Sequence, residues 1–152
     1  MSLNQSVLKV QDYGGGRLLP LRIKTDKPLV LVVEDHEDSR FMLRTMLETR
    51  GFEVIEAADG LEAIETAERE RPNLILMDGT LPLLDGLAAT RRIREYALLR
   101  DVPIIALSGH STMAFQAAAF AAGCTAYLVR PFAFEQLDKL LNQYLQVHPG
   151  AA

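Results

Sequence analysis

From Leu29 onward, the apolar positions of the chain alternate between two patterns. Short continuous apolar runs, such as LVLVV at 29–33 and LILM at 74–77, are typical of strands buried on both faces. Between these runs, apolar residues recur every three or four positions, as on a helix with one buried side. The pattern predicts strands at 29–33, 53–57, 74–77, 102–107 and 126–129, and helices around 42–47, 61–67, 87–96, 111–122 and 134–144.

Residues that commonly end or begin helices mark some of these boundaries. Gly51 closes the first predicted helix, and Asp59 is placed to cap the second. Strands and helices therefore alternate strictly, which predicts an α/β fold with a parallel sheet covered by helices on both faces. In such a sheet, the functional crevice lies at the carboxyl ends of the strands, beside the point where the strand order reverses.

Composition narrows the class of protein. A chain of 152 residues with 49% hydrophobic residues suits one globular domain with a substantial core. The net charge of −4 does not favour nucleic-acid binding, which needs a basic patch. No apolar run approaches the ~18 residues that cross a bilayer, and the N-terminus lacks a secretion signal. The single cysteine, Cys124, excludes a disulfide framework and is expected to be a small buried residue, so we expect a cytoplasmic protein.

The first 27 residues differ from the rest of the chain. They contain three consecutive glycines and five basic against two acidic residues, so they carry a net charge of +3, whereas residues 28–152 carry −7. We expect a flexible N-terminal arm over 1–27 with a short extended piece at LLPLRIK, a folded domain over 28–147 and a tail over 148–152. An extension without a function of its own is favoured over a docking arm.

Chemically distinctive residues follow four of the five predicted strands. Glu34 and Asp35 follow the first strand, Asp78 the third, Ser108 the fourth and Arg130 the fifth. Three carboxylates at one sheet edge would repel one another, and a hard divalent cation such as Mg²⁺ relieves that repulsion. The cation would also shield the negative charges of a phosphoryl donor and of Asp78 from each other as the donor approaches. Ser108 and Arg130 could then bind oxygens of the phosphoryl group. The alternative, that each residue only caps a helix or lies in a solvated loop, is less favoured for the set.

These residues lie in segments that resemble the receiver domain of two-component response regulators, and the resemblance covers residues 29–146. The phosphoacceptor motif D-x-x-x-P-x-x-D-G is present as Asp78, Pro82, Asp85 and Gly86, and the segments ALSG and AYLVRPF match the ends of the fourth and fifth strands. The resemblance implies a flavodoxin-like (βα)5 sandwich with five parallel strands in the order 2-1-3-4-5.

The same resemblance implies a role for each site residue. Asp78 would be the phosphoacceptor, Ser108 and Arg130 would contact the phosphoryl group, and Tyr127 would be the aromatic switch residue. The Arg130–Pro131 bond would often be cis in this family. The implied cofactor is Mg²⁺, with four implied sources of ligands: Asp35 directly, Glu34 through water, Asp78, and the backbone carbonyl of Thr80.

The implied function is a signalling switch that receives a phosphoryl group from a histidine kinase or a phosphotransfer protein. Its chemistry would be limited to self-phosphotransfer and slow autodephosphorylation, so it would not be an enzyme of metabolism. Output would pass to a downstream protein partner or to a second copy through the face of the fourth helix, fifth strand and fifth helix. On that fourth helix, Met113, Phe115 and Phe120 cannot all share one face, so at least one should be exposed. No nucleic-acid or membrane partner is expected.

Some positions depart from the family pattern. Arg130 stands where the family has lysine, and its wider planar fork either holds the phosphoryl group with two donors or props the loop open. We favour retained phosphorylation with altered switching. Gly79 is expected to leave the acceptor less screened from solvent, and Thr80 and His110 flank the expected phosphoryl site. His36 and His148 are interpreted as surface residues.

Two alternatives to the switch remain. One is a degenerate receiver that binds proteins independently of phosphate, against which the intact acidic pocket argues. The other follows from MDGTL at 77–81, which looks like the D-x-D-G-T signature of haloacid-dehalogenase-type phosphatases. That signature needs a nucleophilic aspartate at position 76, which is Leu76, so the phosphatase is the least favoured.

Overall fold

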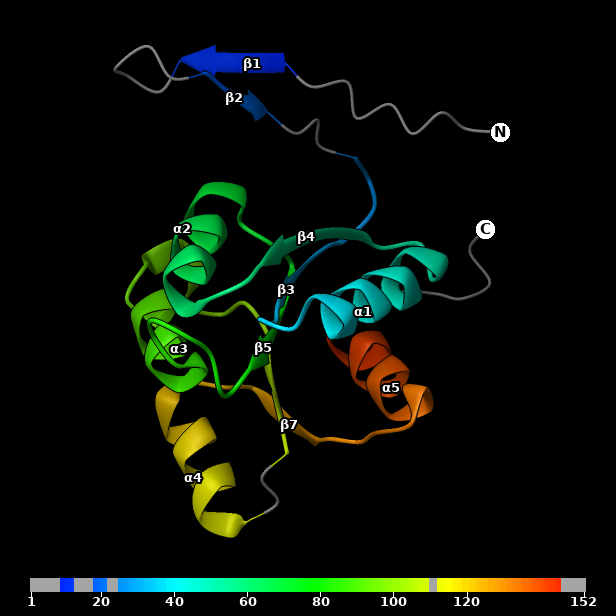
Figure 1. The fold of residues 1–152 in the computed structure, drawn as a ribbon, viewed down its shortest axis with the longest axis vertical. Coiled ribbons are helices and arrows are strands. Elements are labelled where there is room, and N and C mark those ends of the chain that lie inside the picture. Colours follow the sequence, from blue (N-terminus) through cyan, green and yellow to red (C-terminus); the bar gives the residue numbers. More distant parts are fainter. Residues whose placement is uncertain (1–8, 13–17, 22–24, 110–111, 146–152) are drawn as a thin grey trace.

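The computed structural model describes residues 9–12, 18–21, 25–109 and 112–145 (Figure 1). Five parallel strands form the main sheet in the order β4–β3–β5–β6–β7, and a second sheet pairs β1 with β2 antiparallel. The strands are β1 (Lys9–Asp12), β2 (Leu18–Leu21), β3 (Leu29–Val33), β4 (Glu53–Ala57), β5 (Leu74–Asp78), β6 (Ile104–Ser108) and β7 (Ala126–Val129). The helices are α1 (Glu37–Thr49), α2 (Gly60–Glu70), α3 (Gly86–Arg94), α4 (Met113–Ala122), α5 (Phe134–Leu145) and a 3-10 turn at Ala97–Leu99.

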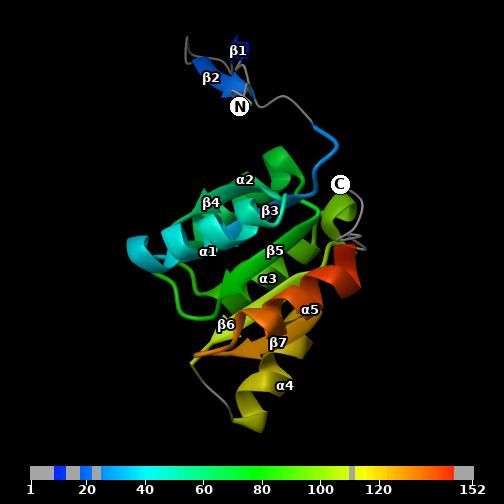
Figure 2. The same ribbon diagram turned by 90° about the vertical axis from the view of Figure 1, so that its right-hand side faces the viewer.

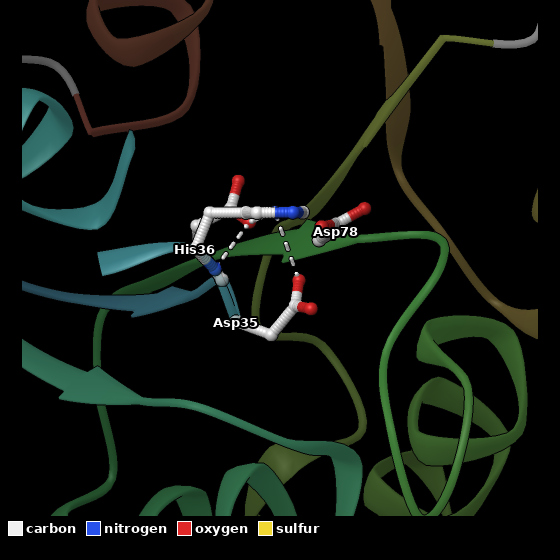
Figure 3. A group of neighbouring side chains, drawn as sticks. Asp35, His36 and Asp78 are labelled. Carbon is white, nitrogen blue, oxygen red and sulfur yellow. Dashed lines mark hydrogen bonds and ion pairs between the residues drawn. The ribbon is translucent and has the colours of Figure 1, made fainter. Parts of the chain in front are cut away.

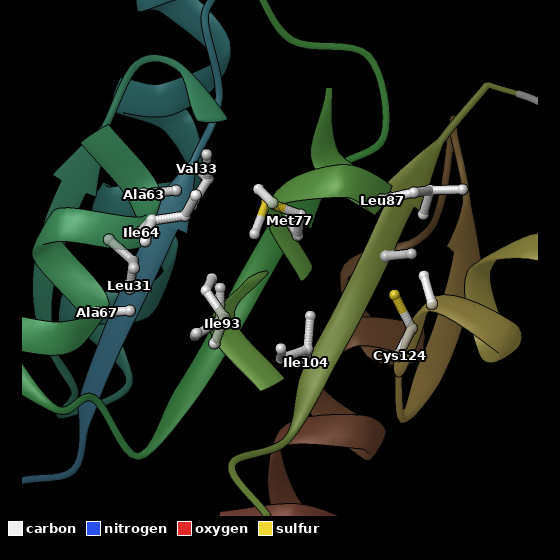
Figure 4. Close-up of a cluster of buried hydrophobic side chains, with 14 of the residues drawn as sticks. Leu31, Val33, Ala63, Ile64, Ala67, Met77, Leu87, Ile93, Ile104 and Cys124 are labelled. Carbon is white, nitrogen blue, oxygen red and sulfur yellow. The ribbon is translucent and has the colours of Figure 1, made fainter. Parts of the chain in front are cut away.

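The helices form two layers, one on each face of the main sheet. Helices α1 and α5 cover one face, and α2, α3 and α4 cover the other (Figures 1 and 2). Along β3, Val30 and Val32 pack against the first pair of helices, whereas Leu31 and Val33 pack against α2 and its neighbours (Figure 4). Because both faces are buried, the strand is apolar throughout, as its sequence predicts.

Local hydrogen bonds fix several helix ends. The Asp59 side chain accepts a hydrogen bond from the backbone N–H of Glu62 (2.8 Å), and the Glu62 carboxylate accepts one from Ala58 (2.6 Å). This reciprocal pair satisfies two backbone donors at the start of α2. Gly51 follows α1 with a φ of 91°, a left-handed conformation that glycine adopts without strain.

The fold class predicted from the sequence is confirmed, because the strand order corresponds to 2-1-3-4-5 once β3 is counted as the first strand of the sheet. Cys124 is buried, also as expected. The apolar periods extend further than the buried stripes, since Met42 on α1 and Leu61 on α2 are exposed. Apolar periodicity alone does not fix the burial of these two residues.

The N-terminal part contains more regular structure than its sequence suggests. The extended piece expected within 18–24 includes β2, and β2 pairs with β1 in the register Lys9 to Leu21. This pair lies outside the layers of the main domain (Figures 1 and 2). Within the described part of the chain, we find no helix with the length and apolar character that a membrane span requires.

Candidate functional site

Four side chains with metal-ligating atoms meet at the carboxyl end of the sheet. Glu34, Asp35 and His36 follow β3, and Asp78 ends the neighbouring strand β5. One ligand atom from each of the four lies within 4.8 Å of the others. Figure 3 shows Asp35, His36 and Asp78 grouped at this edge. Parallel pairing of β3 with β5 therefore brings the carboxylates together, as the strand-end argument predicts.

Glu34 is fully buried, and among the described residues three nitrogens lie within hydrogen-bonding distance of its carboxylate. Arg130 Nη2 lies 2.5 Å from Glu34 Oε1, while the backbone N–H and Nδ1 of His36 lie 3.1 and 3.2 Å from Oε2. Burial alone would raise the pKa of Glu34, but the His36 backbone hydrogen bond and the Arg130 guanidinium outweigh it and lower the pKa. Glu34 is therefore held as a carboxylate whose oxygens already have protein partners.

Asp78 is also buried, with 6% of its surface exposed. Unlike the surroundings of Glu34, those of Asp78 favour the neutral carboxyl group. Its Oδ1 accepts a hydrogen bond from the backbone N–H of Thr80 (3.0 Å), and Arg130 Nη1 lies 4.0 Å from its Oδ2. Burial and the nearby charge of Glu34 together raise the pKa of Asp78 to about 6. A cation beside Asp78 would reverse that shift and keep the group ionised.

Asp35 supplies the clearest sign of a cation-binding site. Its side chain is 30% exposed, yet its Oδ1 is buried and has no hydrogen-bond partner among the described residues. His36 Nδ1 lies 3.3 Å away as an ion-pair neighbour. Buried carboxylate oxygens normally have partners, so an unsatisfied one between acidic neighbours fits a divalent cation with oxygen ligands, as Mg²⁺ prefers.

Two residues at this edge were missed as contributors by the sequence analysis. His36 is mostly exposed, as expected, but its ring folds back onto the acidic pair, and the hydrogen bond to Glu34 and the charges of Asp35 and Glu34 raise its pKa. Arg40 donates from Nη1 to the Glu34 carbonyl (2.8 Å) and from Nε to Glu56 (2.8 Å), which fixes the loop after β3. The position of His36 directly after the acidic pair was the available signal.

The other predicted site residues lie around Asp78. Ser108 is buried at the end of β6, and its carbonyl accepts the backbone N–H of Arg130 (2.8 Å). The Arg130–Pro131 bond is cis. Tyr127 on β7 is partly buried, and Thr80 is exposed beside the acceptor. His110 and His148 lie outside the described residues.

The remaining motif residues build the loop between β5 and α3. Asp85 caps α3, since its side chain accepts a hydrogen bond from the backbone N–H of Ala88 (2.9 Å). Gly86 has no room for a side chain, because a Cβ there would lie 1.9 Å from the Asp78 carbonyl oxygen. The start of α3 can therefore approach the acceptor strand closely only with glycine at this position.

Gly79 lies beside a ring that its sequence does not predict. It was expected to leave Asp78 less screened, but Gly79 is itself buried, and a Cβ there would lie 3.0 Å from Cζ of Phe115. The ring of Phe115 occupies the space that a side chain at position 79 would need. The expected effect on the screening of Asp78 stays a prediction, and the neighbouring ring was not foreseen because the sequence around Gly79 carries no information about α4.

Comparison with known proteins places this geometry in context. Residues 30–142 match the family model described as the response regulator receiver domain. Among curated relatives, the polar-differentiation response regulator DivK of Brucella anthropi is 34% identical over 116 residues, which cover 76% of this chain and 94% of DivK. DivK of Brucella ovis is 33% identical over the same length.

The chain is also similar to solved structures of receiver domains and response regulators. The receiver domain of the sensor histidine kinase PA1611 from Pseudomonas aeruginosa, whose structure has a magnesium ion coordinated in the active-site cleft, is 37% identical with a TM-score of 0.75. That match covers 80% of this chain and 99% of the other. The chemotaxis protein CheY4 of Vibrio cholerae is 31% identical with a TM-score of 0.74, over 78% of this chain and 98% of CheY4.

Proposed function

The chain belongs to the response regulator receiver domain family, and we propose on that basis that it is a phosphoacceptor switch that is phosphorylated on Asp78. The observation that carries the proposal is the buried carboxylate of Asp78 at the end of β5. It lies beside Asp35, which follows β3 and has an oxygen without a hydrogen-bond partner among the described residues. Leu76, where a phosphatase of the haloacid-dehalogenase type would need its nucleophile, is a fully buried strand residue.

In the proposed reaction, an Asp78 carboxylate oxygen attacks the phosphorus of the donor, and the donor group leaves from the opposite side. Asp35, Asp78 and the Thr80 carbonyl would hold Mg²⁺, with Glu34 acting through water. Bound Mg²⁺ would supply charge shielding between the anionic donor and the anionic acceptor. Ser108 and Arg130 would bind the phosphoryl oxygens of the product, an acyl phosphate.

Arg130 must change partners for that role. Its Nη2 is 2.5 Å from Glu34, whereas its Nη1 is 4.0 Å from Asp78. A phosphoryl group on Asp78 would bring new anionic oxygens within reach of the guanidinium, which could then leave Glu34. We therefore propose retained phosphorylation with a switching response unlike that of the usual lysine.

A histidine kinase or a phosphotransfer protein would be the phosphoryl donor. The output would pass to a downstream protein or a second copy through the face formed by α4, β7 and α5. Met113 and Phe120 on α4 are 85% and 50% exposed, which supports such a surface. Sedimentation equilibrium with and without a phosphoryl mimic tests self-pairing, and a monomer under both conditions would exclude the homodimer.

We place the protein in the cytoplasm, in keeping with its single cysteine. Its own chemistry would be self-phosphotransfer and slow hydrolysis of the acyl phosphate, without metabolic turnover.

The test of the proposal is the intact mass of the protein after incubation with acetyl phosphate. We expect a gain of one phosphoryl group that requires Mg²⁺, is abolished by chelator, and is absent in Asp78→Asn. Asp101→Asn, at an exposed aspartate, is the matched control and should load like the unmodified protein. No gain with either acetyl phosphate or a histidine kinase would favour the degenerate, phosphate-independent binding module.

The role of Arg130 has its own test. Arg130→Lys keeps the charge but loses the fork that reaches Glu34. We expect this variant to load phosphate and to differ from the unmodified protein in the backbone amide shifts that follow loading, measured by NMR. The same shift changes in both proteins would remove the idea of altered switching.

A further inference from the structure

Gly79 is not required by its backbone conformation. Its φ lies outside the left-handed region that favours glycine, unlike the φ of Gly51 or Gly123. The restriction is space, because a Cβ at this position would lie 3.0 Å from Cζ and 3.4 Å from Cε1 of Phe115. Gly79 and Phe115 are therefore complementary: one residue lacks the side chain whose place the other fills.

The ring of Phe115 also lies beside two other residues of the site. The same Cβ position is 3.7 Å from Cβ of Ser108, so the ring and Ser108 both lie close to Gly79, the residue that directly follows Asp78. The Phe115 and Tyr127 rings meet edge to face, with centroids 6.0 Å apart and an interplanar angle of 65°. Phe115 thus lies beside Gly79 of the acceptor loop on one side and packs against the expected switch residue, Tyr127, on the other.

The start of α4 holds Phe115 in this position. Thr112 caps the helix, and its side chain accepts a hydrogen bond from the backbone N–H of Phe115 (3.2 Å). Phe115 packs against the buried cluster under α2, α3 and α4, whereas Met113 and Phe120 on the same helix are exposed. Of these three large apolar residues on α4, Phe115 is the one directed at the site.

We propose that Phe115 is a positioning residue that shields the Asp78 acyl phosphate from water and so sets its lifetime. The proposal rests on the proposed function, since it concerns the phosphorylated form of Asp78. In hydrolysis, a water oxygen attacks phosphorus, the bond from phosphorus to the Asp78 oxygen breaks, and the Asp78 carboxylate and inorganic phosphate are released with the proton of the water. A ring over Gly79 removes one path by which that water could approach.

The experiment compares the decay of loaded protein after the phosphoryl donor is removed, measured by intact mass. Phe115→Ala should shorten the half-life by about three-fold to ten-fold, a change of about 1 kcal/mol in the activation free energy. Phe115→Leu keeps most of the side-chain volume. Its half-life should lie between those of Phe115→Ala and the unmodified protein. Phe41→Ala, at an exposed phenylalanine of α1 that belongs to neither the site nor the output face, should decay like the unmodified protein.

A double variant separates shielding from a general loss of structure. Gly79→Leu combined with Phe115→Ala returns a side chain to the same space from the other element. It should restore the half-life toward that of the unmodified protein, although it carries one more substitution than Phe115→Ala. If Phe115 had only a structural role, the double variant should have a shorter half-life than Phe115→Ala, because it carries a second disruptive substitution.

The outcomes are distinct for the two proposals. Unmodified protein that does not load phosphate overturns the proposed function, and the role of Phe115 with it. Loading with an unchanged half-life in both Phe115→Ala and Phe115→Leu overturns the role of Phe115 alone. A double variant that decays no more slowly than Phe115→Ala also overturns it. Should Phe115→Ala fail to fold, Phe115→Leu and the double variant still decide.

Discussion

At the residue scale, Asp78 is held in surroundings that oppose its charge. Burial and the neighbouring Glu34 raise its pKa from 3.8 to about 6, so the folded protein binds a proton here more tightly than the unfolded chain does. A group of this kind contributes its full stability below the unfolded pKa and loses it as the pH rises through the folded pKa. The charge needed for phosphoryl transfer therefore lowers the stability of the metal-free protein at neutral pH.

Asp78→Asn removes this charge with little change in shape. We expect it to stabilise the metal-free protein by up to about 3 kcal/mol at pH 7, a gain that falls between pH 6 and pH 4 and disappears below that range. The measurement is the free energy of unfolding in denaturant with chelator present, as a function of pH. The difference between the two proteins reports Asp78 together with its electrostatic interaction with Glu34. A pH-independent difference would contradict the raised pKa.

At the element scale, Arg94 joins α3 to the segments that enter β6 and β7. Its guanidinium donates to three backbone carbonyls, and its stem lies against Gly123, where a Cβ would come within 2.8 Å of Arg94 Cγ. Burial lowers the pKa of Arg94. The carbonyl distances are 2.9 Å to Leu99, 2.6 Å to Val102 and 2.9 Å to Gly123.

Replacing Arg94 should weaken this junction without altering the acceptor site. Arg94→Met leaves the three carbonyls without this donor, and at about 1 kcal/mol each we expect a loss of about 3 kcal/mol in the free energy of unfolding. Phosphoryl loading of Asp78 at low temperature should be retained. Arg91→Met, at an exposed arginine of the same helix, is the control and should change stability by less than about 0.5 kcal/mol. Equal effects of the two variants would show that the junction contributes little.

At the scale of the whole molecule, the N-terminal strand pair is not part of the main sheet. The five-stranded sheet has both faces covered by helices that lie between residues 37 and 145, and β1 and β2 form a separate sheet. A Thr25 hydrogen bond to Glu53 is the first described side-chain link between the N-terminal part and the main sheet. The domain boundary near residue 28 stays a prediction from the sequence.

Removal of residues 1–24 is the corresponding test. We expect the shortened protein to unfold in one transition with a free energy within about 1 kcal/mol of the full chain, because surface segments with few buried contacts contribute little. Chemical denaturation followed by circular dichroism measures it, and acetyl phosphate loading checks the site. A loss of several kcal/mol would instead make the arm part of the folded domain.

The sequence predicted the features that depend on a residue's place within its own element. Alternating β and α segments fix a parallel sheet, and a parallel sheet brings Glu34, Asp35 and Asp78 to one edge. Asp59 was also identified as a cap, because its bond closes within a few residues. The exposure of Met42 and Leu61 was missed, since apolar period gives the direction of a side chain but not how far the neighbouring element extends.

Only the tertiary structure decided which side chains meet across elements. Arg130 pairs with Glu34, Phe115 fills the space at Gly79, and each pair joins segments far apart in the chain. Helical or strand period limits which face a residue presents, but the partner on that face depends on how the layers are packed. The sequence by itself thus determined the fold and the chemistry available at the strand ends. The packing of loops and helices over that edge determined which charges pair and what covers the acceptor.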